Sequence, residues 1–257
     1  MPRFAANISF LFTELPFLDR IGAAAEAGFG AVECHYPYDA PAAELLAALT
    51  AAGIPMLGIN TRNGTGAAKD AGVAAVPGRE AESLARLRQA IDYAQRIDGR
   101  AVHLTAGNAR HDDPAARDAF VHMLRQASDL AAGLTILIEP LNRRENPDYF
   151  LRSTVQAADI LGRAGRDKVR LMFDIYHAQI NEGDILARIE TLLPQIGHIQ
   201  IAAVPSRAEP DEGEIDYAQV CAALNRMGYA GWIGAEYRPR GETEAGLGWI
   251  SRIGREP

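Results

Sequence analysis

The feature that most constrains the fold is an alternation of short apolar runs with longer helix-like stretches, which repeats eight times along the chain. The short runs are typical of buried strands, and several of the longer stretches carry helix start signals such as Pro114 after Asp113. The expected strands are Phe4–Phe10, Ala31–His35, Met56–Asn60, Ala101–Thr105, Thr135–Glu139, Arg170–Asp174, His198–Ala202 and Trp232–Glu236. The expected helices are Pro16–Ala27, Pro41–Ala52, Arg79–Ile97, Pro114–Ala132, Ser153–Arg163, Asp184–Leu193, Asp216–Met227 and Glu244–Ile253.

This alternation predicts an α/β protein with a parallel sheet and right-handed crossovers. Eight units in 257 residues favour a closed (β/α)₈ TIM barrel over an open sheet, because such barrels typically span about 250 residues. The first expected strand is followed by no glycine-rich turn, which disfavours a dinucleotide-binding fold. No linker or charge run divides the chain, so we expect a single TIM-barrel domain over residues 1–257.

Composition narrows the classes of partner. The formal net charge of −7 disfavours a nucleic-acid partner, since such proteins usually present a basic face. No apolar run approaches the roughly 18 residues of a membrane span, and the N-terminus is a poor signal peptide. Cys34 and Cys221 lie far apart, which indicates reduced thiols. We therefore expect a cytoplasmic protein with a small-molecule substrate, no membrane partner, and a homo-oligomer left open.

Polar residues end the last four expected strands. Buried carboxylates are costly unless they are paired or bind a metal, and the carboxyl ends of barrel strands face one mouth. Three carboxylates and one carboxamide at equivalent positions are hard to explain structurally, and oxygen ligands suit Mg²⁺ or Mn²⁺ better than Zn²⁺. The sequence therefore predicts a divalent-metal site at this mouth, formed by Glu139, Asp174, Gln200 and Glu236.

Histidines add candidate substrate contacts. His35 and His103 lie on the second and fourth expected strands, so they point toward the same mouth, and His177 follows Asp174 by three residues. We expect His103 and His177 to contact substrate, with His35 as a further candidate. His198 lies two residues before Gln200 on the same strand face, which is compatible with a core position at the bottom of the barrel.

Several segments carry a family resemblance in chain order: IEPLN, FDIYHAQI, GHIQIA and GAEYRP, supported by AANISFLF, ECHYPY and VPSRAEPDEGEIDY. Together they resemble the xylose-isomerase-like TIM barrel superfamily, and within it the hydroxypyruvate isomerase family, whose close relatives include 2-oxo-tetronate isomerases. The resemblance covers essentially the whole chain. It implies the same four metal ligands, with Glu139 and Glu236 as the acid/base pair.

The resemblance also implies substrate-binding residues. Related ketose 3-epimerases carry a Glu six residues after the first ligand and a His three after the second, which Glu145 and His177 match. Their Arg lies about six residues after the third ligand, whereas Arg207 lies seven after Gln200, and they carry His where this chain has Gln200. We hypothesise that Arg207 binds a substrate carboxylate through its paired donors. The alternative is a surface arginine paired with Glu209 or Asp211.

The implied reaction is the metal-dependent interconversion of hydroxypyruvate and tartronate semialdehyde, or of a related small 2-oxo or 3-hydroxy acid, through an enediolate. The alternatives are a 2-oxo-tetronate isomerase, a neutral ketose 3-epimerase or a polyol-ketone dehydratase on the same scaffold. A metal-dependent endonuclease would need several metals, many histidine ligands and a basic groove. A catalytically inactive barrel that binds sugar acids is the non-enzyme alternative.

Overall fold

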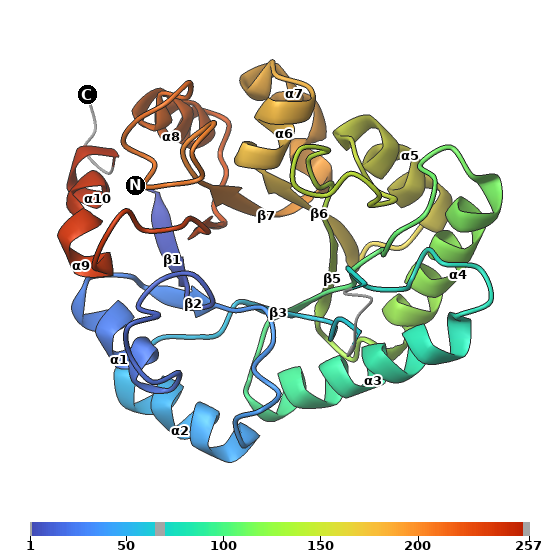
Figure 1. Ribbon diagram of the computed structural model, residues 1–257, viewed down its shortest axis with the longest axis horizontal. Helices are drawn as coiled ribbons and strands as arrows, with labels where there is room; N and C mark the ends of the chain where they lie inside the picture. The colour runs from blue at the N-terminus through green and yellow to red at the C-terminus, as the bar shows by residue number, and fades with distance from the viewer. Residues whose placement is uncertain (1, 65–69, 254–257) are drawn as a thin grey trace.

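The computed structural model describes residues 2–64 and 70–253; residues 1, 65–69 and 254–257 of the predicted domain lie outside this description. The described residues form eight parallel strands in the order β2-β1-β8-β7-β6-β5-β4-β3. The helices form a ring around these strands (Figure 1). The strands are β1 Arg3–Asn7, β2 Ala31–Glu33, β3 Gly58–Asn60, β4 Ala101–His103, β5 Thr135–Ile138, β6 Val169–Asp174, β7 Ile196–Ile201 and β8 Trp232–Ala235.

The ends of the sheet order meet between β2 and β3. A parallel bridge joins Val32 to Met56, and the backbone nitrogens of Leu57 and Cys34 lie 2.7 Å from the Val32 oxygen and 3.2 Å from the Gly58 oxygen, respectively. Each of these contacts is a hydrogen bond across the seam. The sheet is therefore a barrel, and the prediction of a xylose-isomerase-like TIM barrel is confirmed.

The crossover helices begin at residues that can satisfy their free backbone donors. Asp113 accepts a hydrogen bond from Ala115 N at 2.8 Å before α4, and Ser153 accepts one from Gln156 N before α5. The helices are α1 Asp19–Glu26, α2 Ala42–Ala52, α3 Glu80–Arg96, α4 Pro114–Leu130, α5 Thr154–Ala164, α6 Ile175–Asn181, α7 Ile185–Leu192, α8 Tyr217–Arg226, α9 Thr243–Gly246 and α10 Gly248–Ile253, with a 3₁₀ turn at Leu193–Gln195. Within the described ranges, none of these helices has the length and apolarity of a membrane span.

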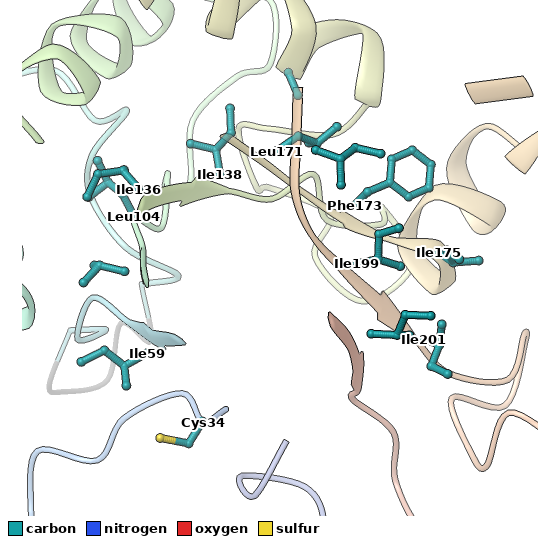
Figure 2. Packing of buried hydrophobic residues seen from close by; sticks show 14 of the residues in the cluster. Cys34, Ile59, Leu104, Ile136, Ile138, Leu171, Phe173, Ile175, Ile199 and Ile201 are labelled. Carbon is teal, nitrogen blue, oxygen red and sulfur yellow. The ribbon is translucent and has the colours of Figure 1, made fainter. Parts of the chain in front are cut away.

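Alternate residues of each strand face opposite sides of the barrel wall. On β5 to β7, the apolar residues Ile138, Phe173 and Ile199 pack outward against the helices (Figure 2). The residue that precedes each of these in its strand points inward. Two of these inward residues, Leu137 and Met172, belong to a separate small cluster. This period-2 pattern continues past the last apolar residue of each strand, so it carries the polar side chains that follow onto the inner face.

Most element boundaries differ from the sequence expectations by one to three residues, and two helices differ in more than their boundaries. The first strand ends at Asn7 instead of Phe10, because Phe10 N and Leu11 N turn back to bond Asn7 O at 3.0 and 2.9 Å. The last predicted helix is two short helices, α9 and α10. A helix was missed at Ile175–Asn181, where α6 begins directly after β6 with Asp174 as its N-cap.

Candidate active site

The four predicted ligands all lie at the carboxyl end of the barrel interior. Asp174 and Gln200 are aligned partners in the β6–β7 pairing, while Glu139 and Glu236 each follow directly after their strand. All four are buried, with exposures between 2% and 5%. The structure therefore gathers the predicted residues within one rim of the barrel, as their strand-end positions predict.

Two oxygens of this set have no hydrogen-bond partner. Glu139 Oε1 and Gln200 Oε1 are buried and receive no donor from the described residues. Asp174 uses Oδ1 to accept from Tyr176 N at 2.7 Å, which leaves Oδ2 for the barrel mouth. Glu139, Asp174 and His177 also offer ligand atoms that lie within 4.8 Å of one another.

These orphaned acceptors provide the test of whether a cation fits. A buried acceptor without a donor is costly, and a divalent cation would satisfy several oxygens at once. Glu139, Asp174 and Gln200 therefore offer an oxygen donor set that suits Mg²⁺ or Mn²⁺. The residues present thus fit the predicted kind of metal.

Glu236 is in a different environment, because every oxygen of its carboxylate already faces a donor. Arg207 lies 2.7 Å from Oε1. Asn7 Nδ2 and Gln200 Nε2 donate to Oε2 at 2.8 Å each, and His35 Nε2 lies 3.2 Å from the same oxygen. His35, the further histidine candidate, therefore contacts a predicted catalytic carboxylate.

A second buried carboxylate, Glu33, shares the same two amide donors. Asn7 Nδ2 and Gln200 Nε2 lie 3.2 Å and 2.7 Å from Glu33 Oε1. The two NH₂ groups thus bridge Glu33 and Glu236 in a closed ring of four hydrogen bonds. His198 Nε2 lies 2.5 Å from Glu33 Oε2, so the predicted bottom-layer histidine supports this ring from within the barrel.

His177 has a defined tautomer. Its Nδ1 accepts from the backbone nitrogen of Asn142 at 3.0 Å, so the proton of the neutral ring lies on Nε2. Burial lowers the pKa of His177 to about 3, which keeps the ring neutral. Nε2 lies 3.7 Å from both Glu139 Oε1 and Asp174 Oδ2. His177 therefore presents an N–H donor to the site, which suits a substrate oxygen better than a cation.

His103 is the least satisfied group of the site. Neither ring nitrogen has a hydrogen-bond partner among the described residues, and Nδ1 lies 3.6 Å from Glu139 Oε2. Burial lowers its pKa to about 3, and the nearby His35 acts in the same direction. His103 is therefore a neutral, buried imidazole beside Glu139, and its unpartnered nitrogens are placed to hydrogen-bond a ligand.

Arg207 is buried, with an exposure of 8%. Besides Glu236, it pairs with Glu145 at 2.7 Å, and its guanidinium carbon lies 5.2 and 5.0 Å from the ring centroids of Phe10 and Tyr176. These two cation–π contacts help to hold the guanidinium in place. Both terminal nitrogens serve protein carboxylates, while Nε is buried with no partner.

The alternative of a surface arginine at position 207 is wrong. Glu209 and Asp211, its expected partners, instead pair with Arg240 at 2.9 Å each. Arg207 turns inward through a left-handed backbone with φ of 57°, where its nitrogen and oxygen bond Ala203 O and Arg238 N. This turn directs the side chain into the barrel mouth.

The two predicted acid/base carboxylates differ in proton affinity. Burial, with the charges of Glu236 and Asp174, raises the pKa of Glu139 well above its ordinary value. Burial also raises the pKa of Asp174 to about 7. Burial acts in the same direction on Glu236, but His35 and Arg207 outweigh it and lower its pKa to about 2. Without a metal, Glu139 therefore holds its proton more tightly than Glu236, and acid/base catalysis needs such a difference between two carboxylates.

Sequence reasoning missed Asn7, Glu33 and Asn142. Period-2 alternation could have found the first two, because Asn7 follows Ala5 by two residues on the inner face and Glu33 precedes His35 by two. Asn142 lies in a loop, where no periodicity predicts a bond to His177.

Comparison with known proteins finds relatives that align over nearly the whole chain. A 2-oxo-tetronate isomerase of Cupriavidus necator is 44% identical over 97% of this chain and 98% of its own length. A Danio rerio protein named "Putative hydroxypyruvate isomerase" is 44% identical over 98% of this chain and 96% of its own length. A crystal structure from Brucella melitensis, described as AP endonuclease, family 2, is 42% identical with a TM-score of 0.95, and the match covers 98% of this chain and 99% of that one.

The family model described as "Xylose isomerase-like TIM barrel" matches residues 21–253. This range contains the four predicted ligands and the predicted substrate-binding residues. Because the family match spans most of the chain and the close relatives align over nearly their full length, the resemblance seen in the sequence motifs is confirmed. The chain belongs to the xylose isomerase-like TIM barrel family.

Proposed function

We propose that this chain is a divalent-metal-dependent isomerase of small hydroxy-keto acids, which interconverts hydroxypyruvate and tartronate semialdehyde or a related 2-oxo acid such as 2-oxo-tetronate. The observation that carries the proposal is the gathering of buried Glu139, Asp174, Gln200 and Glu236 at one mouth of the barrel, where oxygens of Glu139 and Gln200 have no donor among the described residues. The names of the close relatives support an isomerase of this substrate class.

In the proposed reaction, a C–H bond breaks at the hydroxyl-bearing carbon and a C–H bond forms at the neighbouring carbonyl carbon. The hydroxyl proton moves to the former carbonyl oxygen, so the atoms balance through an enediolate. Glu139 and Glu236 are the proposed acid/base pair that removes and returns this proton. The Nε2–H of His177 and the free nitrogens of His103 would hydrogen-bond substrate oxygens, and Glu145, which pairs with Arg207, is the remaining proposed substrate-binding residue.

Glu139, Asp174 and Gln200 would hold the metal, with Glu236 as the fourth predicted ligand. A bound divalent ion supplies positive charge that stabilises negative charge on substrate oxygens. Glu236 already receives donors at both oxygens, so a metal ion at this carboxylate would compete with Arg207 and Gln200.

Arg207 is proposed to recognise the substrate carboxylate. Its terminal nitrogens serve Glu145 and Glu236, so the buried Nε is the free donor in this structure. Arg207→Ala should sharply reduce kcat/KM for hydroxy-keto acids, and Arg207→Lys should restore only part of it. Equal losses on acids and on neutral ketoses would reject carboxylate recognition.

The reaction is tested by NMR in deuterated buffer, with Mg²⁺ or Mn²⁺ and after chelation. Hydroxypyruvate, four-carbon 2-oxo acids and neutral ketoses are offered in parallel. We expect metal-dependent interconversion of an acid, with solvent deuterium incorporated at carbon. Turnover of ketoses alone would favour the epimerase alternative, and absence of turnover and exchange on every substrate would favour a binding barrel.

The endonuclease description of the Brucella structure is tested in the same series with a DNA duplex that contains an abasic site. The net charge of −7 disfavours a DNA groove. Among the described residues there is one candidate metal cluster, and it contains a single histidine. An endonuclease of this kind would need several metals and many histidine ligands. We expect no strand cleavage.

A further inference from the structure

We infer that Glu33 is a positioning residue that sets the orientation of the Gln200 amide, so that its Oε1 is available to a bound metal ion. Glu33 belongs to β2, on the opposite side of the amide ring from Glu236. The inference rests on the proposed metal site, and it concerns a residue outside the predicted ligand set.

A glutamine amide can rotate by half a turn and exchange its oxygen with its nitrogen at little steric cost. In this site, two carboxylates that accept hydrogen bonds from the amide nitrogen oppose the exchange. Gln200 Nε2 lies 2.7 Å from Glu33 Oε1 and 2.8 Å from Glu236 Oε2. An NH₂ group has two hydrogens, so these two acceptors use both of them. With the nitrogen fixed, Oε1 must face away from the carboxylates.

A rotated amide would place Oε1 against two acceptor oxygens and would put Nε2 where the unpartnered Oε1 now lies. Both consequences are unfavourable, because acceptors repel each other and an N–H cannot bind a cation. Gln200 Oε1 has no partner among the described residues, which is the arrangement expected of a ligand held ready. Two acceptors are needed because Glu236 alone would hold only one of the two hydrogens.

Hydrogen bonds hold the Glu33 carboxylate in place beside an open cavity. Glu33 lines a cavity of about 250 Å³ in the barrel interior, which extends from His103 near the mouth to Arg100 at the amino ends of the strands. His198 Nε2 holds Glu33 Oε2 at 2.5 Å, and Asn7 holds Oε1. Outer partners of this kind orient metal ligands in proteins.

Gly234 makes room for this carboxylate. A Cβ at position 234 would lie 2.6 Å from both oxygens of Glu33, closer than such atoms can approach. A larger residue there would force the carboxylate to shift from its present position. Gly234 therefore gives a second, steric way to perturb Glu33 without changing its chemistry.

The test measures Mn²⁺ affinity by electron paramagnetic resonance and calorimetry. Glu33→Met keeps an unbranched chain but removes the acceptor, and loss of an outer partner typically weakens metal binding about 10–100-fold. Glu33→Gln can keep an acceptor oxygen and should lose less. Leu57→Met changes a residue of the same cavity that contacts no predicted ligand, and it should bind Mn²⁺ as the unmodified protein does.

A double-mutant cycle separates positioning from general damage. If Glu33 acts through the Gln200 amide, Glu33→Met should weaken Mn²⁺ binding strongly in the native background and by less than about threefold in a Gln200→Ala background. Equal losses in both backgrounds, or no loss in the native one, would overturn the inference. Should Glu33→Met fail to fold, as judged by circular dichroism without metal, Gly234→Ala takes its place in the same cycle. If the unmodified protein binds no Mn²⁺, the proposed metal site fails instead.

Discussion

The ion pair between Arg207 and Glu236 gives a prediction whose size follows from its burial. Arg207→Met keeps most of the length and the apolar stem of the side chain but removes the charge that faces Glu236 Oε1 at 2.7 Å. Both partners are buried, with exposures of 8% and 4%. The change therefore leaves a carboxylate inside the barrel without its main counter-charge.

Two estimates of the resulting loss of folding stability agree. Opposite charges about 4 Å apart interact by about 4 kcal/mol at an effective dielectric constant of about 20. Removal of one partner from a buried ion pair typically destabilises a protein by about 3–5 kcal/mol. Asn7 and Gln200 continue to donate to Glu236, so we expect the lower part of this range, about 3 kcal/mol at pH 7.

The cost should depend on pH in a defined direction. The pKa of Glu236 in the folded protein is about 2, below its ordinary value of 4.5. A lowered pKa of a carboxyl group stabilises the fold above the ordinary value, and this contribution is lost as the pH falls through the folded value. Without Arg207 the contribution shrinks. The difference between the two proteins should therefore be full above about pH 5 and small near pH 2.

Urea unfolding of the chelated protein at several pH values measures this difference. Arg238→Met is the matched control, because Arg238 is 64% exposed and reaches Glu145 only at 3.5 Å. An exposed pair contributes about 0–1 kcal/mol, so the control should unfold almost as the unmodified protein does. Equal, small effects of both substitutions at pH 7 would refute the reasoning.

Three further predictions concern the metal and the substrate. Glu139→Gln should lower kcat by about 10²–10⁴, since it removes one member of the proposed acid/base pair at nearly constant shape, and unchanged turnover with normal metal content would contradict this. Mn²⁺ affinity should rise as the pH increases through about 7, because Asp174, whose pKa is about 7, and Glu139, whose pKa is also raised, must lose their protons to bind; calorimetry in buffers of different ionisation enthalpy should detect the released protons. His177→Phe should reduce kcat/KM about 10–100-fold and leave Mn²⁺ affinity unchanged, because the Nε2 that faces the site carries a proton; a parallel loss of Mn²⁺ affinity would show that His177 is a ligand instead.

Strand-end residues could be predicted from the sequence because two regularities act together. Parallel barrel strands end at one mouth, and side chains alternate across the barrel wall. Glu139, Asp174 and Gln200 follow apolar strands of clear period, so their shared location required no knowledge of the loops. The same two rules place Glu33 inside the barrel, although its role becomes visible only when Gln200 lies beside it.

The environment of Arg207 lay beyond such reasoning. Its partners Glu145, Phe10 and Tyr176 come from three other segments, and its backbone lies in a left-handed turn that no local pattern signals. Helix α6 was also missed, because the sequence shows no break between it and the preceding strand. Asp174 both ends β6 and caps α6, so no loop residues separate the strand from the helix.

The pKa values of Glu139 and Glu236 move in opposite directions because the groups around the two carboxylates differ, and not because one carboxylate is more buried than the other. Their exposures, 5% and 4%, are nearly equal, so burial alone would raise both pKa values alike. Glu236 receives Arg207, His35 and two amides, whereas Glu139 Oε1 receives no donor from the described residues. His35, which follows β2, and Arg207, in the loop after β7, therefore lower the proton affinity of Glu236 relative to that of Glu139 in the metal-free protein.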